Sequence, residues 1–171
     1  SAAVTTYTVT YDLNGGTGTT PTQANVVAGG TFTLAASSGF SKAGYSFAGW
    51  NDGTTTYNAG ATYTMPAKAV TLKAQWTELP KYTVTWNVNG DQSVTTQVTE
   101  GSKPTFPTTP SSCDATSTTF YGWATATWDG KVNDVSAKTI YTSANEMPAV
   151  NGAVTYYAVF AKKETSGSGT A

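Results

Sequence analysis

The side chains that could do chemistry are few in this chain. It holds nine basic and ten acidic residues among 171, and every basic residue is a lysine, because the sequence contains neither histidine nor arginine. Hydrolysis by a histidine-activated serine or cysteine, metal binding by histidine and phosphate binding by arginine clamps all lack their usual residue. The net charge of −1 also leaves no basic surface for nucleic acid, so we expect no nucleic-acid partner.

Cysteine and carboxylate chemistry is equally poorly supported. Cys113 is the one cysteine, so it forms no disulfide within the chain, and no histidine is present to activate it. Asp129 and Asp134 flank a short loop, but the alternating carboxylates and closing glutamate of a calcium loop are missing. A glycosidase needs two carboxylates at a fixed separation, and no motif marks such a pair. The sequence therefore predicts no catalytic residue, no metal site and no cofactor.

Aromatic side chains are the remaining candidates for a binding site. Trp50 and Trp123 each follow a glycine, in register with strand-like patterns, which favours core packing over a sugar-stacking surface. Trp128 differs, because it lies in a polar insertion at 124–145 that the first half of the chain lacks. A loop tryptophan is a common ligand contact, although its ring could instead fill a gap in its own module. Trp128 is the candidate ligand contact.

The elements that position these residues come in two copies. Tyr-Thr-Val-Thr-Tyr-Asp-Leu-Asn-Gly at 7–15 matches Tyr-Thr-Val-Thr-Trp-Asn-Val-Asn-Gly at 82–90, and Gly-Trp, Met-Pro and a closing strand pattern recur in the same order. Such repetition indicates a tandem duplication. We expect a first module at 1–78, a second, divergent module at 79–164 with an insertion at about 124–145, and a flexible tail at 165–171. The short linker with Pro80 is expected to restrict the modules' relative orientation.

Apolar or aromatic side chains occupy every second position along four stretches, at 7–13, 70–76, 82–88 and 154–160. A period of two predicts strands with one buried face. Further strands are expected near 23–34, 45–50 and 62–65, with counterparts of the first two at 95–106 and 119–123. At most one helical turn is expected, near 34–40 or 110–115. The predicted fold class is mainly β, with two tandem small β modules that have little or no helix.

Three motifs of the first copy resemble the Listeria–Bacteroides repeat family, which includes the internalin B-repeat. They are the opening at 7–16, Gly-Tyr-Ser-Phe-Ala-Gly-Trp at 44–50, and Met-Pro at 65–66 followed by Val-Thr-Leu-Lys-Ala-Gln-Trp at 70–76. The second copy diverges at Asp91, Thr119 and Phe160, which stand where the family has Gly, Tyr and Trp. The resemblance implies β-grasp-like modules, found in tandem arrays on secreted or cell-surface bacterial proteins as spacers or adhesive elements and without catalytic residues.

The leading functional expectation is a non-enzymatic, extracellular or cell-surface module pair that acts as a spacer and interaction element. Its partner would be a protein or glycan of a host or neighbouring cell. Two alternatives stay open: a structural subunit of a filament, sheath or surface layer that self-associates through strand edges, and a carbohydrate-binding module appended to an enzyme. No apolar run of about eighteen residues is present, so no membrane insertion is expected.

Overall fold

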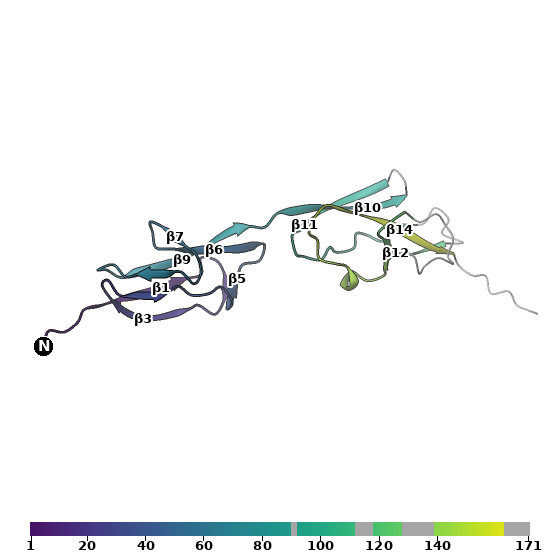
Figure 1. Cartoon of the computed structure of the whole chain (residues 1–171). Coiled ribbons are helices and arrows are strands. Elements are labelled where there is room, and N and C mark those ends of the chain that lie inside the picture. Colours follow the sequence, from purple (N-terminus) through teal and green to yellow (C-terminus); the bar gives the residue numbers. More distant parts are fainter. Residues whose placement is uncertain (90–91, 112–117, 128–138, 163–171) are drawn as a thin grey trace, which may run out of the picture. The chain divides into compact units, whose positions relative to one another are not determined.

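The chain divides into two compact units, unit 1 at Ser1–Leu79 and unit 2 at Pro80–Ala171 (Figure 1). The structure is a computed structural model, and it describes residues 1–89, 92–111, 118–127 and 139–162. Each unit is built on its own sheet of five strands, and helix is almost absent from the described residues. The prediction of two tandem, mainly β modules is therefore confirmed.

Unit 1 consists of nine strands joined by tight turns. They are β1 (Thr6–Asp12), β2 (Thr17–Gly18), β3 (Thr22–Val27), β4 (Thr31–Thr33), β5 (Phe40–Ser41), β6 (Tyr45–Asn51), β7 (Thr56–Tyr57), β8 (Thr62–Thr64) and β9 (Val70–Glu78). The main sheet has the order β3-β1-β9-β6-β7, in which β1 and β9 run parallel and the other neighbours are antiparallel. Two small antiparallel ladders, β2 with β5 and β4 with β8, complete the unit.

Unit 2 repeats this sheet. Its elements are β10 (Lys81–Asn89), β11 (Gln92–Thr99), β12 (Thr118–Ala124), β13 (Ile140–Tyr141), the 3-10 turn η2 (Ala144–Glu146) and β14 (Val154–Lys162). The strand order is β11-β10-β14-β12-β13, again with one parallel pair, β10 with β14. Each strand therefore occupies the place of its counterpart in unit 1, and the sequence repeat corresponds to a repeat of the same sheet.

Trp50 lies at the centre of the unit 1 core and has no exposed surface. Its ring centroid lies 4.6 Å from that of Tyr11, 5.3 Å from Phe40 and 5.1 Å from Phe47. The indole Nε1 donates a hydrogen bond of 2.9 Å to the Ala35 carbonyl, so the polar atom of the ring is also satisfied. The prediction that Trp50 packs in the core is confirmed.

Trp123 has the same role in unit 2, where it is 1% exposed. Its ring centroid lies 4.9 Å from that of Trp86 and 5.4 Å from that of Phe120. Trp86 in turn donates from Nε1 to the Thr96 hydroxyl at 3.1 Å, which ties the core to β11. Trp86 follows the period of two along β10, whereas Phe120 and Trp123 lie three residues apart, on either side of an irregularity in β12.

The expected strand at 23–34 is in fact two strands, β3 and β4. Gly29 adopts φ of 76°, which other residues rarely do, and the Gly30 N–H donates to the Val27 carbonyl to close a turn. The strand expected at 95–106 likewise ends at Thr99, because a turn follows in which Gly101 has φ of 77°. The helical turn expected near 34–40 is absent; a 3-10 turn forms at Ala144–Glu146 instead. Most of 110–115 lies outside the described residues.

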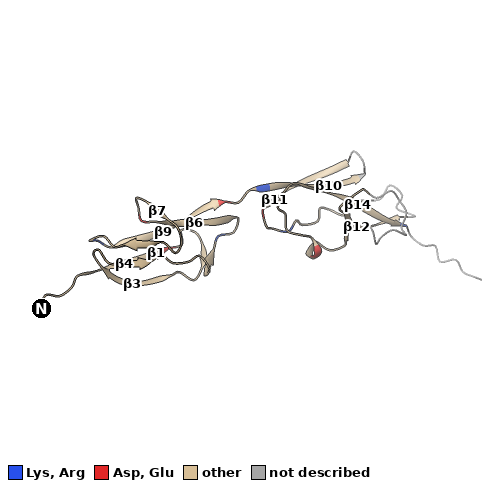
Figure 2. Cartoon of the chain, in the orientation of Figure 1, with Lys and Arg blue, Asp and Glu red and all other residues tan. Residues whose placement is uncertain are grey.

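The connection between the units is short, because β9 ends at Glu78 and β10 begins at Lys81. The Leu79 N–H donates to the Gly44 carbonyl within unit 1. The Pro80 carbonyl accepts from the Glu100 N–H within unit 2. Each of the two connecting residues is therefore held by its own unit. Figure 2 marks the charged residues along the described chain and shows how few they are.

Candidate functional site

The residues singled out from the sequence form no surface site in the described part of the chain. Trp128, the candidate ligand contact, lies outside the described residues, as do Cys113, Asp129 and Asp134. The first Asn-Gly pair forms the expected turn, with Asn14 at φ of 49° and its N–H bound to the Asp12 carboxylate at 2.8 Å. A site must therefore be sought among residues that the sequence did not mark.

An open groove with a volume of about 710 Å³ lies on unit 1. One wall is the turn from β6 to β7, and another is the loop that leads from β8 into β9. The groove is lined by polar, aromatic and lysine side chains, among them Asp52, Tyr57, Tyr63, Lys68, Thr71 and Lys73. Its lining is more polar than that of most small-molecule pockets, which are mainly apolar.

In the β6–β7 turn, the side chains of Asn51 and Asp52 accept hydrogen bonds from backbone N–H groups that would otherwise bind water. The Asn51 side chain accepts from the Gly53 N–H at 2.8 Å and donates to the Thr56 hydroxyl at 2.9 Å. The Asp52 carboxylate accepts from the N–H groups of Thr54 and Thr55, each at 2.9 Å. Asn and Asp favour such turns because their short side chains reach the backbone two residues on. The wall of the groove is therefore built locally.

Tyr63 ties this turn to β8, since its hydroxyl donates to the second Asp52 oxygen at 3.0 Å. Burial acts against the charge of Asp52, but the hydrogen bonds from Thr55, Thr54 and Tyr63 outweigh it and lower the pKa of the carboxyl. Burial first, and then the Asp52 carboxylate, raise the pKa of Tyr63 to about 12. Asp52 is consequently an ionised anchor whose oxygens are already in use, and it is poorly suited to transfer protons.

We expect alkaline pH to destabilise unit 1 partly through Tyr63. Between pH 10 and 12 the unfolded chain loses this proton while the folded chain keeps it, so the free energy of unfolding falls as pH rises through that window. Tyr63→Phe removes the contribution, and its stability is expected to fall less steeply there. Some slope remains, because burial also raises the pKa of Tyr11, against a smaller opposing effect of the Ala35 N–H.

Urea unfolding of the parent chain and of Tyr63→Phe at several pH values measures this slope. The interval from pH 7 to 9 serves as the control, because both chains keep the phenols protonated there and their stability difference is expected to stay constant. Parallel curves from pH 10 to 12 would show that Asp52 and burial do not hold the Tyr63 proton.

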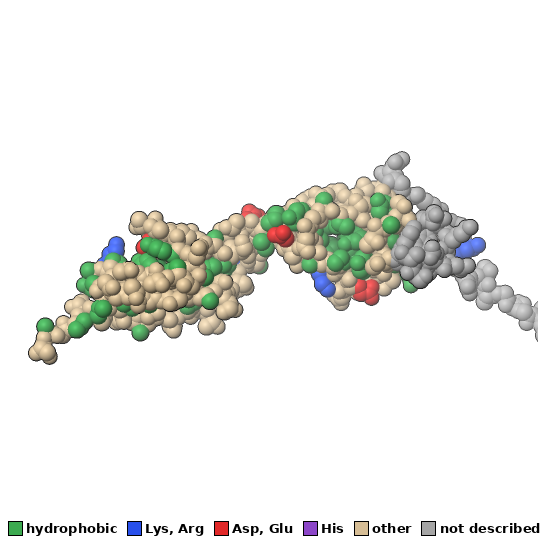
Figure 3. All heavy atoms as spheres, in the orientation of Figure 1, with side chains coloured by type: hydrophobic (Ala, Val, Ile, Leu, Met, Phe, Trp, Pro, Cys, Tyr) green, Lys and Arg blue, Asp and Glu red, His purple; other side chains and the backbone are tan. Residues whose placement is uncertain are grey.

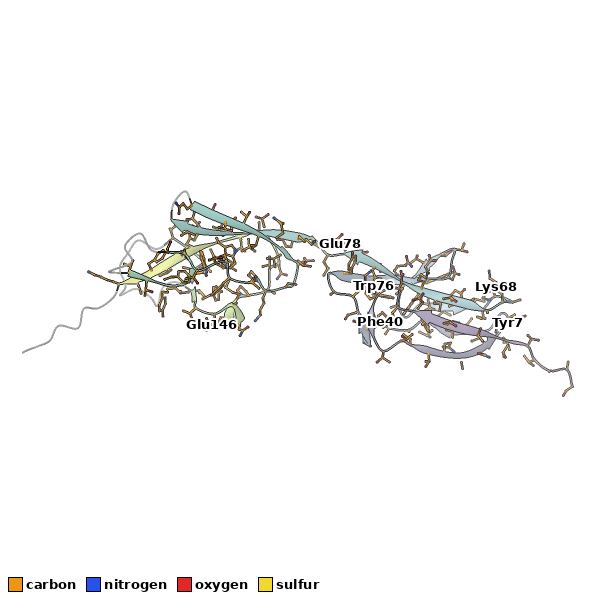
Figure 4. All side chains as sticks on the ribbon, turned by 180° about the vertical axis from the view of Figure 1, so that it is seen from behind. Tyr7, Phe40, Lys68, Trp76, Glu78 and Glu146 are labelled. Atoms are coloured by element: carbon orange, nitrogen blue, oxygen red, sulfur yellow. The ribbon has the colours of Figure 1, made fainter. Side chains whose placement is uncertain are left out.

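Two lysines stand at the rim of the groove. Lys73 of β9 has its Nζ 4.0 Å from Asp12 Oδ2, and these side chains remain 54% and 47% exposed. Lys68 is exposed on the loop before β9, at the end of unit 1 that also carries Tyr7 (Figure 4). It pairs with no carboxylate within the described ranges. In the view of Figure 3 most of the described surface is neutral.

The described residues of unit 2 form no equivalent of this rim. The strand registers make Val154 the counterpart of Val70, so Gly152 stands at the position of Lys68, two residues before the strand. The strand registers pair Asp12 with Lys73 in unit 1 and Asn87 with Tyr157 in unit 2, so Tyr157 replaces Lys73. The short β6–β7 turn is also replaced by a longer stretch between β12 and β13. The groove therefore belongs to unit 1 alone as far as the described residues reach.

Sequence reasoning looked for a site in the insertion of the second copy and missed this groove. Available signals were the Asn51-Asp52-Gly53 turn and the lysines on either side of the start of β9. Among the described residues no group of three His, Cys, Asp or Glu side chains could hold a metal ion. No helix in the described part of the chain is long and apolar enough to cross a membrane.

The fold and the duplicated core define a class of protein: a tandem pair of all-β repeat units. Comparison with known families identifies the repeat, since the Listeria-Bacteroides repeat domain matches residues 7–75 and again residues 82–159. The chain belongs to this family, as the resemblance of its motifs implied.

Internalin H of Listeria monocytogenes serovar 1/2a is a curated relative. It is 32% identical over 160 residues, which cover 92% of this chain but 26% of internalin H. The chain therefore spans about a quarter of the length of that relative. Together, the family and this similarity support a repeat module of a surface protein.

Proposed function

We propose that the chain is a non-enzymatic pair of repeat modules in a surface or secreted bacterial protein, where it acts as a spacer and interaction element. The observation that carries the proposal is the direct repetition of one five-stranded sheet with two residues between the last strand of unit 1 and the first of unit 2. A connection of two residues leaves little chain that could adopt different conformations between the two units. The repeat family is a non-enzymatic kind of domain, which supports the same reading.

The surface of the units suits a spacer. Threonine side chains occupy three of the four exposed positions of β1, with Asp12 at the fourth, and recur along β10, so water is bound mostly by hydroxyl groups rather than by charges. With only 11% charged residues, the solubility of such a pair depends little on ionic strength. Partners of the interaction element would be proteins or glycans of a host or neighbouring cell.

A distance measurement between the units tests the spacer role. Thr54→Cys and Ala149→Cys, in a Cys113→Ser background, place one fluorescent label on each unit. A spacer is expected to give one narrow distribution of single-molecule energy transfer, and inserting a Gly-Ser stretch between Leu79 and Pro80 is expected to broaden it. A distribution already as broad as that of the insertion variant would contradict the proposal.

A second candidate function, a subunit that assembles through strand edges, is favoured by β11. This strand lies at the end of its sheet, and its eight residues, Gln92–Thr99, include no charged residue and no proline. Natural edge strands are commonly protected by lysine, proline or bulges. Val94 is 50% exposed on this strand.

Self-assembly through β11 predicts concentration-dependent association that a charge abolishes. We expect Val94→Lys to remain monomeric at concentrations where the parent chain associates, because an edge charge would be buried on pairing. Sedimentation velocity over a concentration series measures this, with Val27→Lys on β3 of unit 1 as the matched control. Val27 is likewise exposed on an edge strand. A parent chain that stays monomeric throughout would exclude the assembly role.

A further inference from the structure

We propose that the groove of unit 1 binds an extended anionic glycan, a sugar chain whose carboxylate or sulfate groups lie against Lys68 and Lys73. The inference rests on the interaction role proposed above and gives that role a ligand class and a place. It also moves the site away from the insertion of the second copy. The groove is open and holds about 710 Å³, enough for a few sugar units of a longer chain.

The charge of the groove favours an anion. Asp52, its one acidic lining residue, has both oxygens engaged, by the Thr54 and Thr55 N–H groups and by the Tyr63 hydroxyl. Lys68 faces solvent without a carboxylate partner in the described residues. Lys73 meets Asp12 only at 4.0 Å, and exposed pairs of this kind contribute little. Asp52 stays ionised, so the lining residues carry a net charge of +1, with Asp12 beside Lys73, and the two ammonium groups are the charged hydrogen-bond donors left for a ligand.

The walls of the groove favour a sugar. Tyr57 is half-buried, and its ring meets that of Tyr63 edge to face with centroids 5.2 Å apart, so it offers a fixed aromatic surface. Thr54, Thr64 and Thr71 add exposed hydroxyl groups, which can both donate to and accept from sugar hydroxyls. Aromatic rings among hydroxyl groups match the apolar faces and hydroxyl edges of pyranose rings.

An acidic peptide fits less well. Extended peptides commonly bind by adding a strand to an exposed sheet edge, where the main chain supplies most of the hydrogen bonds. The sheet edge at the groove is β7, which is two residues long, Thr56–Tyr57. Such a short edge offers few main-chain bonds, whereas the side-chain hydroxyls are numerous. The observations therefore favour a glycan over a peptide.

The inference is tested on the whole chain with four defined probes: polygalacturonate oligomers, dextran sulfate, neutral dextran and poly-glutamate. Isothermal titration gives the affinities, and amide NMR shifts locate the bound probe. We expect one or both anionic sugars to bind and to shift the amides of residues 51–57 and 63–73, and neutral dextran to bind more weakly. Binding of polygalacturonate would identify carboxylate as the preferred anionic group, and binding of dextran sulfate would identify sulfate.

Two charge-matched variants separate the groove from general attraction. The double variant Lys68→Gln, Lys73→Gln is expected to weaken binding by about tenfold or more, because both lysines that contact the ligand are lost. Lys42→Gln with Lys162→Gln removes the same charge elsewhere and is expected to leave the affinity within about twofold. All four lysines are on the surface of the described units, and the amide spectrum of each variant checks that it folds.

Three outcomes would overturn the inference. Equal loss in the two double variants would mean that any polyanion is held by net charge, and equal binding of poly-glutamate would point to an acidic peptide. If neither of the two anionic sugars bound, anionic glycans would be excluded as the ligand class. The energy-transfer measurement of the spacer role does not depend on these results, so the two proposals can fail separately.

Discussion

Replacing Trp50 by alanine is expected to unfold unit 1 or to leave it barely stable. The indole is fully buried, contacts three aromatic rings and donates its N–H to the Ala35 carbonyl. Removing a buried tryptophan typically costs about 3–5 kcal/mol through lost burial and the cavity left behind. Small domains have about 5–15 kcal/mol in total, so this single change removes a large part of the stability of unit 1.

Urea unfolding followed by amide NMR measures the effect in each unit of the intact chain. The two units have separate core clusters, so the resonances of unit 2 are expected to keep their midpoint while those of unit 1 shift to much lower urea. A common shift of both units would mean that they unfold as one cooperative body.

Trp76→Phe is the matched control for this change. Trp76 is half-buried and donates to the Leu13 carbonyl at 2.9 Å, and unit 2 carries Phe160 at the corresponding place. The loss of one hydrogen bond and a little volume is expected to cost about 1–2 kcal/mol. If Trp50→Ala cost no more than Trp76→Phe, the aromatic cluster around Trp50 would not be the centre of the core.

Much of this fold can be predicted from the sequence, because the two copies provide an internal check on the strands of the main sheet. Val9 and Val84, or Trp50 and Trp123, hold the same places in both units, and an alternating pattern that recurs is unlikely to be chance. The strand breaks were harder to foresee. Whether Gly29-Gly30 continues a strand or turns depends on a backbone angle that glycine permits without requiring.

The candidate groove was beyond the reach of sequence reasoning for a different reason. Asp52, Lys68 and Lys73 are each ordinary surface residues, and only the pairing of β6 with β7 and of β6 with β9, in which Asn51 lies opposite Lys73, brings them to one groove. The repeat also drew attention to what the second copy adds, at 124–145, and away from what the first copy keeps. Comparing the copies position by position, Lys73 against Tyr157, would have pointed to unit 1.

The glycine before each core tryptophan has a structural cause that the second large prediction tests. In β6 the pairing with β9 shifts between Phe47 and Gly49, so the strand bulges and Gly49 turns to φ of 131°. The same irregularity in β12 falls between Phe120 and Gly122. A β-bulge changes the direction in which the following side chain points, and here the following side chain is that of the core tryptophan. The glycine and the tryptophan therefore act together: the bulge at the glycine directs the indole into the core.

Gly49→Ala is expected to destabilise unit 1 by about 2–5 kcal/mol. Two costs add up: an L-residue at this φ is strained by about 1–2 kcal/mol, and overpacking costs about 1–3 kcal/mol. The overpacking arises because the new Cβ would overlap the Tyr57 carbonyl oxygen and lie 3.0 Å from Thr56 Cγ2. The clash involves backbone of β7, so relief would require β7 to move away from β6 and would open the groove as well.

Gly29→Ala separates the two costs, because Gly29 also has a positive φ, 76°, but no atom lies within 4 Å of where its Cβ would be. This control is expected to lose about 1 kcal/mol, from backbone strain alone. The unit 1 midpoint in urea, read from its amide resonances, compares the variants. If Gly49→Ala and Gly29→Ala lost the same stability, close packing of β7 would not be what requires a glycine at position 49, and its backbone conformation alone would explain it.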